Sequence, residues 1–233
     1  ELPAFADTIR VRHIISHTSG LREFINLLMM GGLNLGRGDW IDRRELVEIV
    51  QRQPALQNKP GAEFNYNNTA FGLAALIVER TSGKPFHEFM QENVFGPLGM
   101  SRSMVRPDPQ HIVPQSSMGY GPGPDGILEM RDLGASVGAG GIYTSVEDLQ
   151  VWGENYLNPR VGTREMIEAM TTAHTLNDGK STSYGYGLFV DEQGGVKRVH
   201  HGGADVAHRS MFAFYPTLRA GVTVQSNDAR FDS

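Results

Sequence analysis

The spacing of hydrophobic residues changes near residue 184, and this change limits the possible folds more than any other feature of the chain. Beyond that point, short segments rich in aromatic and β-branched residues alternate with turn signals such as Gln193-Gly-Gly195 and Pro216. Segments of this composition with short connections are typical of antiparallel strands. We therefore predict an antiparallel meander with strands over residues 184–190, 196–199, 210–215 and 221–225.

Upstream of residue 184 the apolar residues recur at helical spacing instead. Residues 42–53 predict a surface helix, and the dense apolar face over 71–78 predicts a buried helix that stops at Ser82-Gly83. Helices followed by an antiparallel sheet indicate an α+β fold. Further helices are expected over residues 9–15, over residues 86–94 and from Ser145 onward.

Glycine and proline interrupt this pattern in two places. Phe95-Gly-Pro-Leu-Gly-Met100 is expected to break the helix over 86–94. From Arg106 to Gly126 the composition turns rich in Pro, Gly, Ser and His. A linker between domains has the same composition, but we favour a loop that shapes a pocket.

The composition excludes several classes of function. The chain has 233 residues, a formal net charge of -5 and no Lys/Arg cluster, which argues against a nucleic-acid partner. It has no cysteine, so disulfides and thiolate metal sites are excluded. No run approaches the ~18 to 20 apolar residues of a membrane span. Because the chain starts at Glu1 without an initiator Met, we expect a truncated polypeptide, above all at the N-terminus.

Tyr66-Asn-Asn68, directly before the predicted buried helix, is the first candidate functional segment. A phenol near a cationic amine can shuttle a proton, and a nearby carboxamide can orient a substrate. Tyr66 and Asn68 can face one cavity from a loop that leads into a helix. The alternative is structural, because Asn and Tyr before a helix commonly serve as a cap and a packing residue.

His200-His-Gly-Gly203, between two predicted strands, is the second candidate. A strand edge can pair with an extended substrate, glycine permits close approach, and His201 can donate to a carboxylate or a developing oxyanion. The alternative is a His-Gly turn in a hairpin. His13 and His17 are four residues apart, as metal ligands on a helix can be, but structural hydrogen bonding is the better interpretation.

Four motifs follow one another along the chain and together are more specific than either candidate alone. They are His13-Ile-Ile-Ser-His-Thr-Ser-Gly-Leu21, Lys59-Pro-Gly61 with Tyr66-Asn-Asn68, Gly140-Gly-Ile-Tyr-Thr-Ser-Val-Glu-Asp-Leu149 and His201-Gly-Gly203. In order and approximate spacing the chain resembles the serine β-lactamase-like hydrolases. This family includes class C β-lactamases, penicillin-binding proteins, D-alanyl-D-alanine carboxypeptidases, D-aminopeptidases and certain esterases.

The resemblance implies one β-lactamase/transpeptidase-like domain over residues 1–233, with an antiparallel sheet flanked by helices. A mainly helical and loop subdomain is expected over about 22–135, and a helix with the sheet over about 136–233. It also implies a serine hydrolase that acts through an acyl-enzyme on an ester, amide or β-lactam bond of a small molecule or peptide. Such an enzyme needs no metal or organic cofactor, and its home would be periplasmic or secreted.

The resemblance also assigns roles to individual residues. Tyr66 and Asn68 match the family's Tyr-x-Asn element, in which the tyrosine moves a proton together with a lysine. His201 and Gly203 match its strand motif, and the backbone N–H of Ala204 is the candidate oxyanion donor. A histidine in place of the strand lysine favours esterase or peptidase activity over β-lactamase activity.

The family's nucleophile, the serine of Ser-x-x-Lys, has no match in this chain, because no serine is followed three residues later by lysine. We expect that segment upstream of Glu1, and this polypeptide alone should not acylate. The main alternative is a non-catalytic binding protein that retains the pocket. A weaker one uses Ser136, which lies in a Gly-x-Ser-x-Gly sequence like the nucleophile elbow of α/β-hydrolases.

Overall fold

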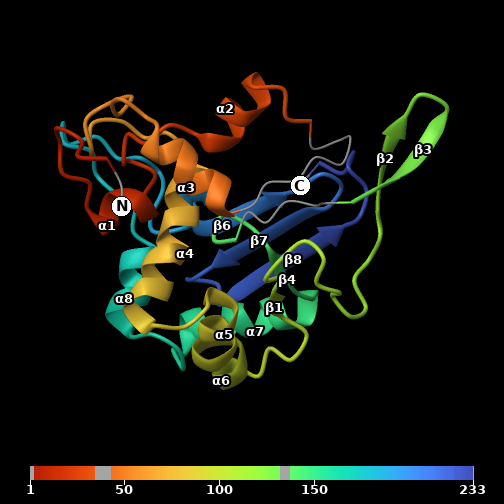
Figure 1. The fold of residues 1–233 in the computed structure, drawn as a ribbon. Helices are drawn as coiled ribbons and strands as arrows, with labels where there is room; N and C mark the ends of the chain where they lie inside the picture. Colours follow the sequence, from red (N-terminus) through yellow and green to blue (C-terminus); the bar gives the residue numbers. More distant parts are fainter. Residues whose placement is uncertain (1–2, 35–42, 132–136, 233) are drawn as a thin grey trace.

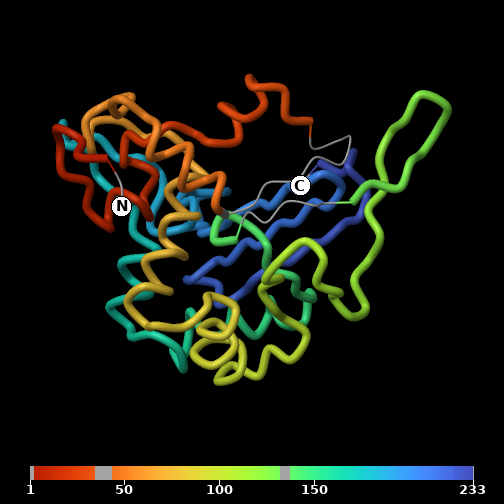
Figure 2. The backbone as a smooth tube through the Cα atoms, viewed as in Figure 1, coloured from red at the N-terminus to blue at the C-terminus, as the bar shows by residue number. Residues whose placement is uncertain are grey.

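A four-stranded sheet with helices beside it forms the centre of the computed structural model, which describes residues 3–34, 43–131 and 137–232 (Figures 1 and 2). The helices are α1 (Val11–Ile15), α2 (Phe24–Met30), α3 (Arg43–Gln51), α4 (Asn68–Ser82), α5 (Phe86–Met90), the π-helical turn η2 (Gln91–Phe95), α6 (Gly96–Leu98), α7 (Val146–Leu157) and α8 (Arg164–Met170). The strands are β1 (Met104–Val105), β2 (Gly119–Gly123), β3 (Gly126–Met130), β4 (Ile142–Tyr143), β5 (Phe189–Gln193), β6 (Val196–Ala204), β7 (Arg209–Tyr215) and β8 (Ala220–Ser226).

Strands β5 to β8 pair antiparallel in chain order, so the predicted meander is confirmed. The first strand begins at Phe189 and not at residue 184 as predicted. Ser183 and Gly187 have φ values of 55° and 80°, in the left-handed region that a regular strand does not use. Tyr184 is therefore carried by a loop, where its side chain is buried. At the other end, β6 runs past His201, so the His-Gly segment is strand and not a hairpin turn.

One face of the sheet packs against α7 and α8. Val199 of β6 and Phe212 and Phe214 of β7 lie in one apolar cluster with Tyr156 of α7. Side chains alternate between the two faces of a strand. His201 lies two residues after Val199 and directly opposite Phe212, so it shares the helix-covered face.

Helix α4 is the predicted buried helix, and α1, α2 and α3 pack against it (Figure 1). The side chain of Asn67 caps its start by accepting the Ala70 N–H at 2.8 Å. The helix ends at Gly83, whose φ of 71° suits the left-handed position after a helix. The loop that carries Tyr66 therefore ends in a fixed cap.

Two segments predicted as irregular are partly regular. The helix that begins at Phe86 continues through η2 into α6 and ends at Gly99. Pro97 does not break it, because Pro97 lies in the first turn of α6, where a missing N–H is tolerated. Within the loop predicted from Arg106 to Gly126, strand β2 pairs with β3 around Pro124-Asp125. On its outer edge β2 is bonded through Tyr120, to Asn227 and Ala229, and Pro122 lies beyond this contact, where a missing N–H is tolerated. This hairpin projects from the body of the molecule (Figure 1).

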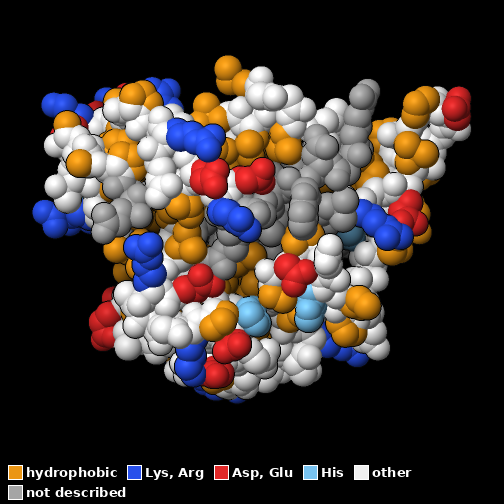
Figure 3. Space-filling model, viewed as in Figure 1, with side chains coloured by type: hydrophobic (Ala, Val, Ile, Leu, Met, Phe, Trp, Pro, Cys, Tyr) orange, Lys and Arg blue, Asp and Glu red, His pale blue; other side chains and the backbone are white. Residues whose placement is uncertain are grey.

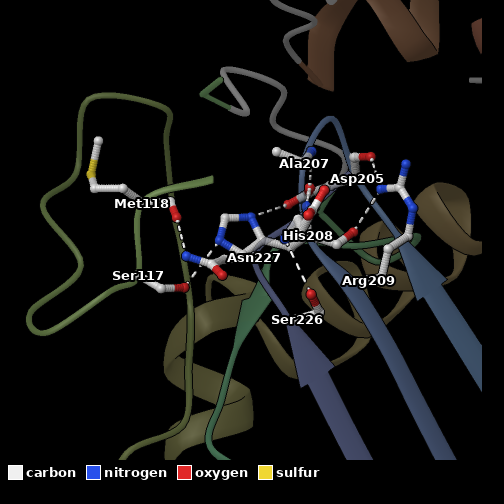
Figure 4. Close-up of polar contacts among 9 residues, drawn as sticks. Ser117, Met118, Asp205, Ala207, His208, Arg209, Ser226 and Asn227 are labelled. Atoms are coloured by element: carbon white, nitrogen blue, oxygen red, sulfur yellow. Dashed lines mark hydrogen bonds and ion pairs between the residues drawn. The ribbon is translucent and has the colours of Figure 1, made fainter. Parts of the chain in front are cut away.

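The turn between β6 and β7 is tied to the loop before β2 by three residues, Ser117, Asp205 and His208, which we call the His208 cluster (Figure 4). His208 lies 3.3 Å from the Asp205 carboxylate through Nδ1 and 3.1 Å from the Ser117 hydroxyl through Nε2. The other Asp205 oxygen accepts the Ala207 and His208 N–H groups. Asn227, after β8, donates to the Met118 carbonyl at 2.8 Å and reinforces the same attachment.

Candidate active site

The segment after α1 turns the His17 side chain into the protein. His17 itself has a φ of 56°, and the Ser16 and Thr18 hydroxyls hydrogen-bond each other at 2.9 Å. Gly20 has a φ of 75°, and a Cβ there would lie 2.1 Å from the Asn58 carbonyl oxygen. Glycine is thus required at that position both by backbone conformation and by space.

The turn at Lys59-Pro-Gly61 holds this segment from the other side. Gly61 donates its N–H to the Thr18 carbonyl at 2.8 Å, and Asn65 donates its N–H to the His17 carbonyl at 2.9 Å. The first two motifs found in the sequence are therefore one hydrogen-bonded unit. These hydrogen bonds fix the position of the segment that leads into Tyr66.

The three residues of the Tyr-Asn-Asn segment differ in environment. Tyr66 is 44% exposed, whereas Asn67 is buried and donates its side-chain amide to the Leu21 carbonyl at 2.8 Å. Asn68 is half-buried, and its backbone N–H donates to the Glu23 carboxylate. The predicted structural role as a cap thus belongs to Asn67, which leaves Tyr66 and Asn68 as the candidates for function.

The end of β6 supplies the other side of the site. Its pairing with β5 stops at His200, opposite Phe189, whereas its pairing with β7 continues to Ala204, opposite Arg209. Within the described residues, the stretch 201–204 is therefore paired along one edge only. His201 and Gly203 on this stretch are half-buried, and Ala204 is exposed. An extended substrate can add to such an open edge.

The structure brings the two candidate motifs together although they lie 135 residues apart in sequence. The Tyr66 hydroxyl is 3.5 Å from His201 Nε2, and the centroids of the two rings are 5.9 Å apart. This distance is long for a hydrogen bond, so the phenol remains available to other groups. A phenol, an imidazole and an open strand edge thus border one site.

Sequence reasoning missed two members of this site, His17 and Tyr184. The Tyr184 hydroxyl lies 3.1 Å from His17 Nε2 and 3.1 Å from His201 Nε2. His17 was expected to hydrogen-bond structurally, and Tyr184 to begin a strand. The one available signal was chemical, since a buried tyrosine usually finds a partner for its hydroxyl. We call His17, Tyr66, Tyr184 and His201 the His201 cluster.

Burial shifts the titration of the His201 cluster. It lowers the pKa of His17 to about 4, with a smaller contribution from the neighbouring His201. It also lowers the pKa of His201 and, together with the Glu23 carboxylate, raises the pKa of Tyr66. Near neutral pH the two histidines are uncharged and the phenol keeps its proton.

Metal binding by His13 and His17 on one helix face does not fit the geometry. Helix α1 ends at Ile15, and His13 Nδ1 accepts the Arg10 N–H at 3.2 Å. Across the described ranges no three His, Asp or Glu side chains gather as metal ligands would. Ser136, the alternative nucleophile, lies outside the described residues.

Two observations concern the surface. None of the described helices combines the length and apolar character that crossing a membrane requires. On the face shown in Figure 3, basic and acidic side chains are interspersed. No patch of one sign is visible there.

Comparison with known proteins identifies the family of this chain. Residues 1–233 match the beta-lactamase family along their whole length. The chain belongs to that family. A D-aminopeptidase of Gluconobacter oxydans is 26% identical over 220 residues, which cover 92% of this chain and 41% of that protein. The chain thus spans less than half the length of this curated relative of the family.

Solved structures of related proteins share the fold. A penicillin-binding protein homologue from Pyrococcus abyssi, described as octameric, superposes with a TM-score of 0.84 at 25% identity, covering 99% of this chain and 54% of that one. A D-stereospecific amidohydrolase from Streptomyces sp. superposes with a TM-score of 0.80 at 25% identity, covering 95% and 68%. The predicted β-lactamase/transpeptidase-like fold is therefore confirmed.

Proposed function

We propose that this chain forms the substrate-binding part of a serine hydrolase that cleaves an amide bond through an acyl-enzyme. The observation that carries the proposal is the meeting of Tyr66 and His201 beside the open edge of β6, with 3.5 Å between the hydroxyl and Nε2. Two motifs that resemble those of one enzyme family share one site here. The nucleophile is expected in a Ser-x-x-Lys segment upstream of Glu1.

The proposed reaction has two steps. As the serine oxygen attacks the substrate carbonyl carbon, Tyr66 accepts the serine proton and passes its own to the neutral lysine, and the same relay returns a proton to the amine as the C–N bond breaks. Water then attacks the resulting ester, which releases the acid and restores the serine. Because burial and Glu23 raise the pKa of Tyr66, the phenol enters the cycle protonated and fits the role of proton carrier.

The end of β6 holds the substrate in this proposal. The stretch 201–204 offers backbone groups along its open edge, and the Ala204 N–H is the candidate donor to the oxyanion. Asn68 orients the substrate from the start of α4. A Cβ at Gly203 would approach the Ser210 hydroxyl to 2.4 Å, so a side chain there would require the Ser210 hydroxyl to rotate away.

We propose amides of D-amino acids as the substrate class. The relatives named D-aminopeptidase and D-stereospecific amidohydrolase support this choice. Burial also keeps His201 uncharged, so the strand lacks the cation that recognition of a substrate carboxylate often uses. Substrates without a carboxylate beside the scissile bond therefore suit the site better than β-lactams do.

The test uses a polypeptide extended upstream of Glu1 to include Ser-x-x-Lys. It should hydrolyse the p-nitroanilide of D-alanine faster than that of L-alanine, and a p-nitrophenyl ester should leave an acyl adduct detectable by intact mass spectrometry. Replacing the Ser-x-x-Lys serine by alanine should abolish the adduct, whereas Ser136→Ala should retain it. The 233-residue chain alone should form none. Absence of hydrolysis with amides, esters and a fluorescent penicillin alike would refute the proposal.

The alternative of a non-catalytic binding protein makes a different prediction. It expects the extended polypeptide to bind D-alanine amide reversibly, with heat released in calorimetry but without an adduct. The sequence upstream of Glu1 separates the two at once. A Ser-x-x-Lys there favours the enzyme, and its absence favours the binding protein.

A further inference from the structure

The His201 cluster contains a chain of hydrogen bonds whose direction is set at both ends by backbone groups. At one end the Asn67 N–H donates to His17 Nδ1 at 3.0 Å. A neutral His17 therefore carries its proton on Nε2, and it donates that proton to the Tyr184 hydroxyl oxygen at 3.1 Å.

The other end fixes the same direction independently. His201 Nδ1 lies 2.6 Å from the Gly202 carbonyl oxygen, which can only accept, so Nδ1 carries the proton. His201 Nε2 then has a lone pair, and the Tyr184 hydroxyl donates to it at 3.1 Å. The Tyr184 hydroxyl thus accepts from one histidine and donates to the other, and every member is satisfied.

The surroundings of this chain favour its neutral form. His17 is 1% exposed and Tyr184 is also 1% exposed. The titratable groups facing the two histidines are Tyr66, Tyr184 and each other, with His200 next to His201 on β6 and Glu23 acting on Tyr66. A proton added to His201 Nε2 would leave the hydroxyl proton of Tyr184 without its acceptor in this series of hydrogen bonds.

His17 also contacts Tyr66 directly. Their ring centroids are 4.1 Å apart at an interplanar angle of 36°, and Phe71 lies 4.8 Å away from the His17 ring. The Tyr66 phenol therefore rests against a ring that is itself held at both nitrogens. The buried His17 thus contacts Tyr66 directly and is linked to His201 through the Tyr184 hydroxyl.

We infer that His17 and Tyr184 are positioning residues, which hold the His201 ring neutral by a hydrogen bond to its Nε2 lone pair and hold the Tyr66 ring in place for proton transfer. This inference rests on the proposed function for its catalytic consequence. Because the Nε2 lone pair of His201 is already used by Tyr184, the Tyr66 hydroxyl is left free to bond to the serine and lysine expected upstream.

The tautomer is tested on the 233-residue chain itself, by long-range ¹H–¹⁵N NMR with ¹⁵N-labelled histidine. His17→Asn and His201→Asn assign the signals. We expect His201 with its proton on Nδ1 and His17 with its proton on Nε2, both neutral at pH 7. In Tyr184→Phe, the Gly202 carbonyl should keep the proton of His201 on Nδ1, whereas the pKa of His201 should rise because its Nε2 has lost the hydroxyl donor. Tyr156→Phe removes a hydroxyl from another buried tyrosine and should leave both signals unchanged.

Activity is tested on the extended polypeptide, with active sites titrated so that misfolded protein does not count. Tyr184→Phe should lower kcat about ten-fold with little change in KM, and its activity should fall at acidic pH where the parent enzyme still works. His17→Asn should do the same, because asparagine tolerates the left-handed backbone and keeps an acceptor for the Asn67 N–H but cannot reach Tyr184.

The outcomes separate the two claims. If His201 carries its proton on Nε2, or if Tyr184→Phe leaves the pKa of His201 and kcat unchanged in an active enzyme, the positioning roles are wrong. If the tautomers are as expected but the extended polypeptide hydrolyses nothing, the proposed function fails and with it the catalytic consequence.

Discussion

Two histidine clusters lie at the ends of the last stretch of β6, and they differ in what surrounds the imidazole. His201 has neutral partners, a phenol and a backbone carbonyl, and its neighbour His17 is almost fully buried. His208 has a carboxylate partner, and its side chain and that of Asp205 are 34% and 35% exposed. Under the proposed function, one residue type takes part in proton control in one place and attaches a loop in the other.

The connectivity of the His208 cluster is that of a Ser-His-Asp triad, yet its setting is that of a turn. Asp205 and His208 are three residues apart in the β6–β7 connection, and the second Asp205 oxygen is used by backbone N–H groups of the same turn. Ser117 is exposed on the loop before β2. Connectivity alone therefore does not assign chemistry, and burial and an open strand edge distinguish the His201 cluster.

The largest expected effect concerns the hydroxyl groups of Tyr66 and Ser117, one in each histidine cluster. In the extended polypeptide, Tyr66→Phe removes the proton carrier and should lower kcat by about 100- to 1000-fold with little change in stability, since Tyr66 is 44% exposed. Ser117→Ala is the matched control and should change kcat less than about two-fold. Steady-state kinetics on titrated enzyme measures both. A comparable loss in Ser117→Ala would move the active site to the His208 cluster.

The second prediction concerns stability and pH. Burial lowers the pKa of His17 to about 4 in the folded chain, whereas the unfolded chain has the ordinary value of 6.5. Between these values the unfolded state binds more protons, so the free energy of unfolding falls as pH drops from about 6.5 to 4, by about 3 kcal/mol. Urea unfolding at several pH values measures the slope.

The control for this slope is His17→Asn, which removes the titrating group. Its unfolding free energy should be less dependent on pH over the same range. An equal slope in the variant and the parent would show that His17 is not held neutral, and the contrast with the carboxylate-bound His208 would disappear.

Much of the fold could be predicted from the sequence because it depends on local patterns. Apolar spacing and breakers located α3, α4, α7 and the meander. The helix expected from Ser145 onward is present, and the Ser145 hydroxyl caps it by accepting the Asp148 N–H at 3.2 Å. The β2–β3 hairpin was missed because Gly and Pro dominate the composition of β2. Its pairing depends on a ribbon geometry that tolerates them.

The site was predictable only in part, because its members meet over long sequence separations. Tyr66 and His201 were found through motif order, and their proximity is a property of the fold. The contact between His17 and Tyr184 joins residues 167 positions apart. Neither residue type by itself predicts that its side chain belongs to a series of buried hydrogen bonds. Whether Asn68, Gly203 and Ala204 act as the resemblance implies remains a prediction.

The third prediction concerns the backbone of the segment that carries His17 and tests whether that backbone is held rigidly. Gly20 and Gly83 have similar φ values of 75° and 71°, but a Cβ at Gly20 meets the Asn58 carbonyl at 2.1 Å whereas one at Gly83 meets nothing within 4 Å. Gly20→Ala should therefore destabilise the chain by about 3 kcal/mol, and Gly83→Ala by about 1 kcal/mol, as expected for backbone strain alone. Thermal unfolding compares the two. Equal effects would mean that the segment around His17 can shift freely.

The smallest expected effect concerns the His208 cluster. Burial alone would raise the pKa of Asp205, but hydrogen bonds from the His208 side chain and from the His208 and Ala207 N–H groups together lower it. A carboxyl with a lowered pKa stabilises the fold above its unfolded value of about 4, and this contribution is lost as pH falls through the lower folded value. With the carboxylate about one third exposed, we expect only about 0.5 kcal/mol.

Asp205→Asn tests this contribution, since asparagine keeps an acceptor for the turn but has no charge to lose. Between pH 5 and pH 3 the parent should lose about 0.5 kcal/mol more unfolding free energy than the variant does. The two should respond alike between pH 5 and 6.5, where His17 contributes to the slope, because Asp205 stays ionised there. If Asp205→Asn instead removed the slope above pH 5, the two clusters would be coupled along β6, and the separation of proton control from loop attachment would be wrong.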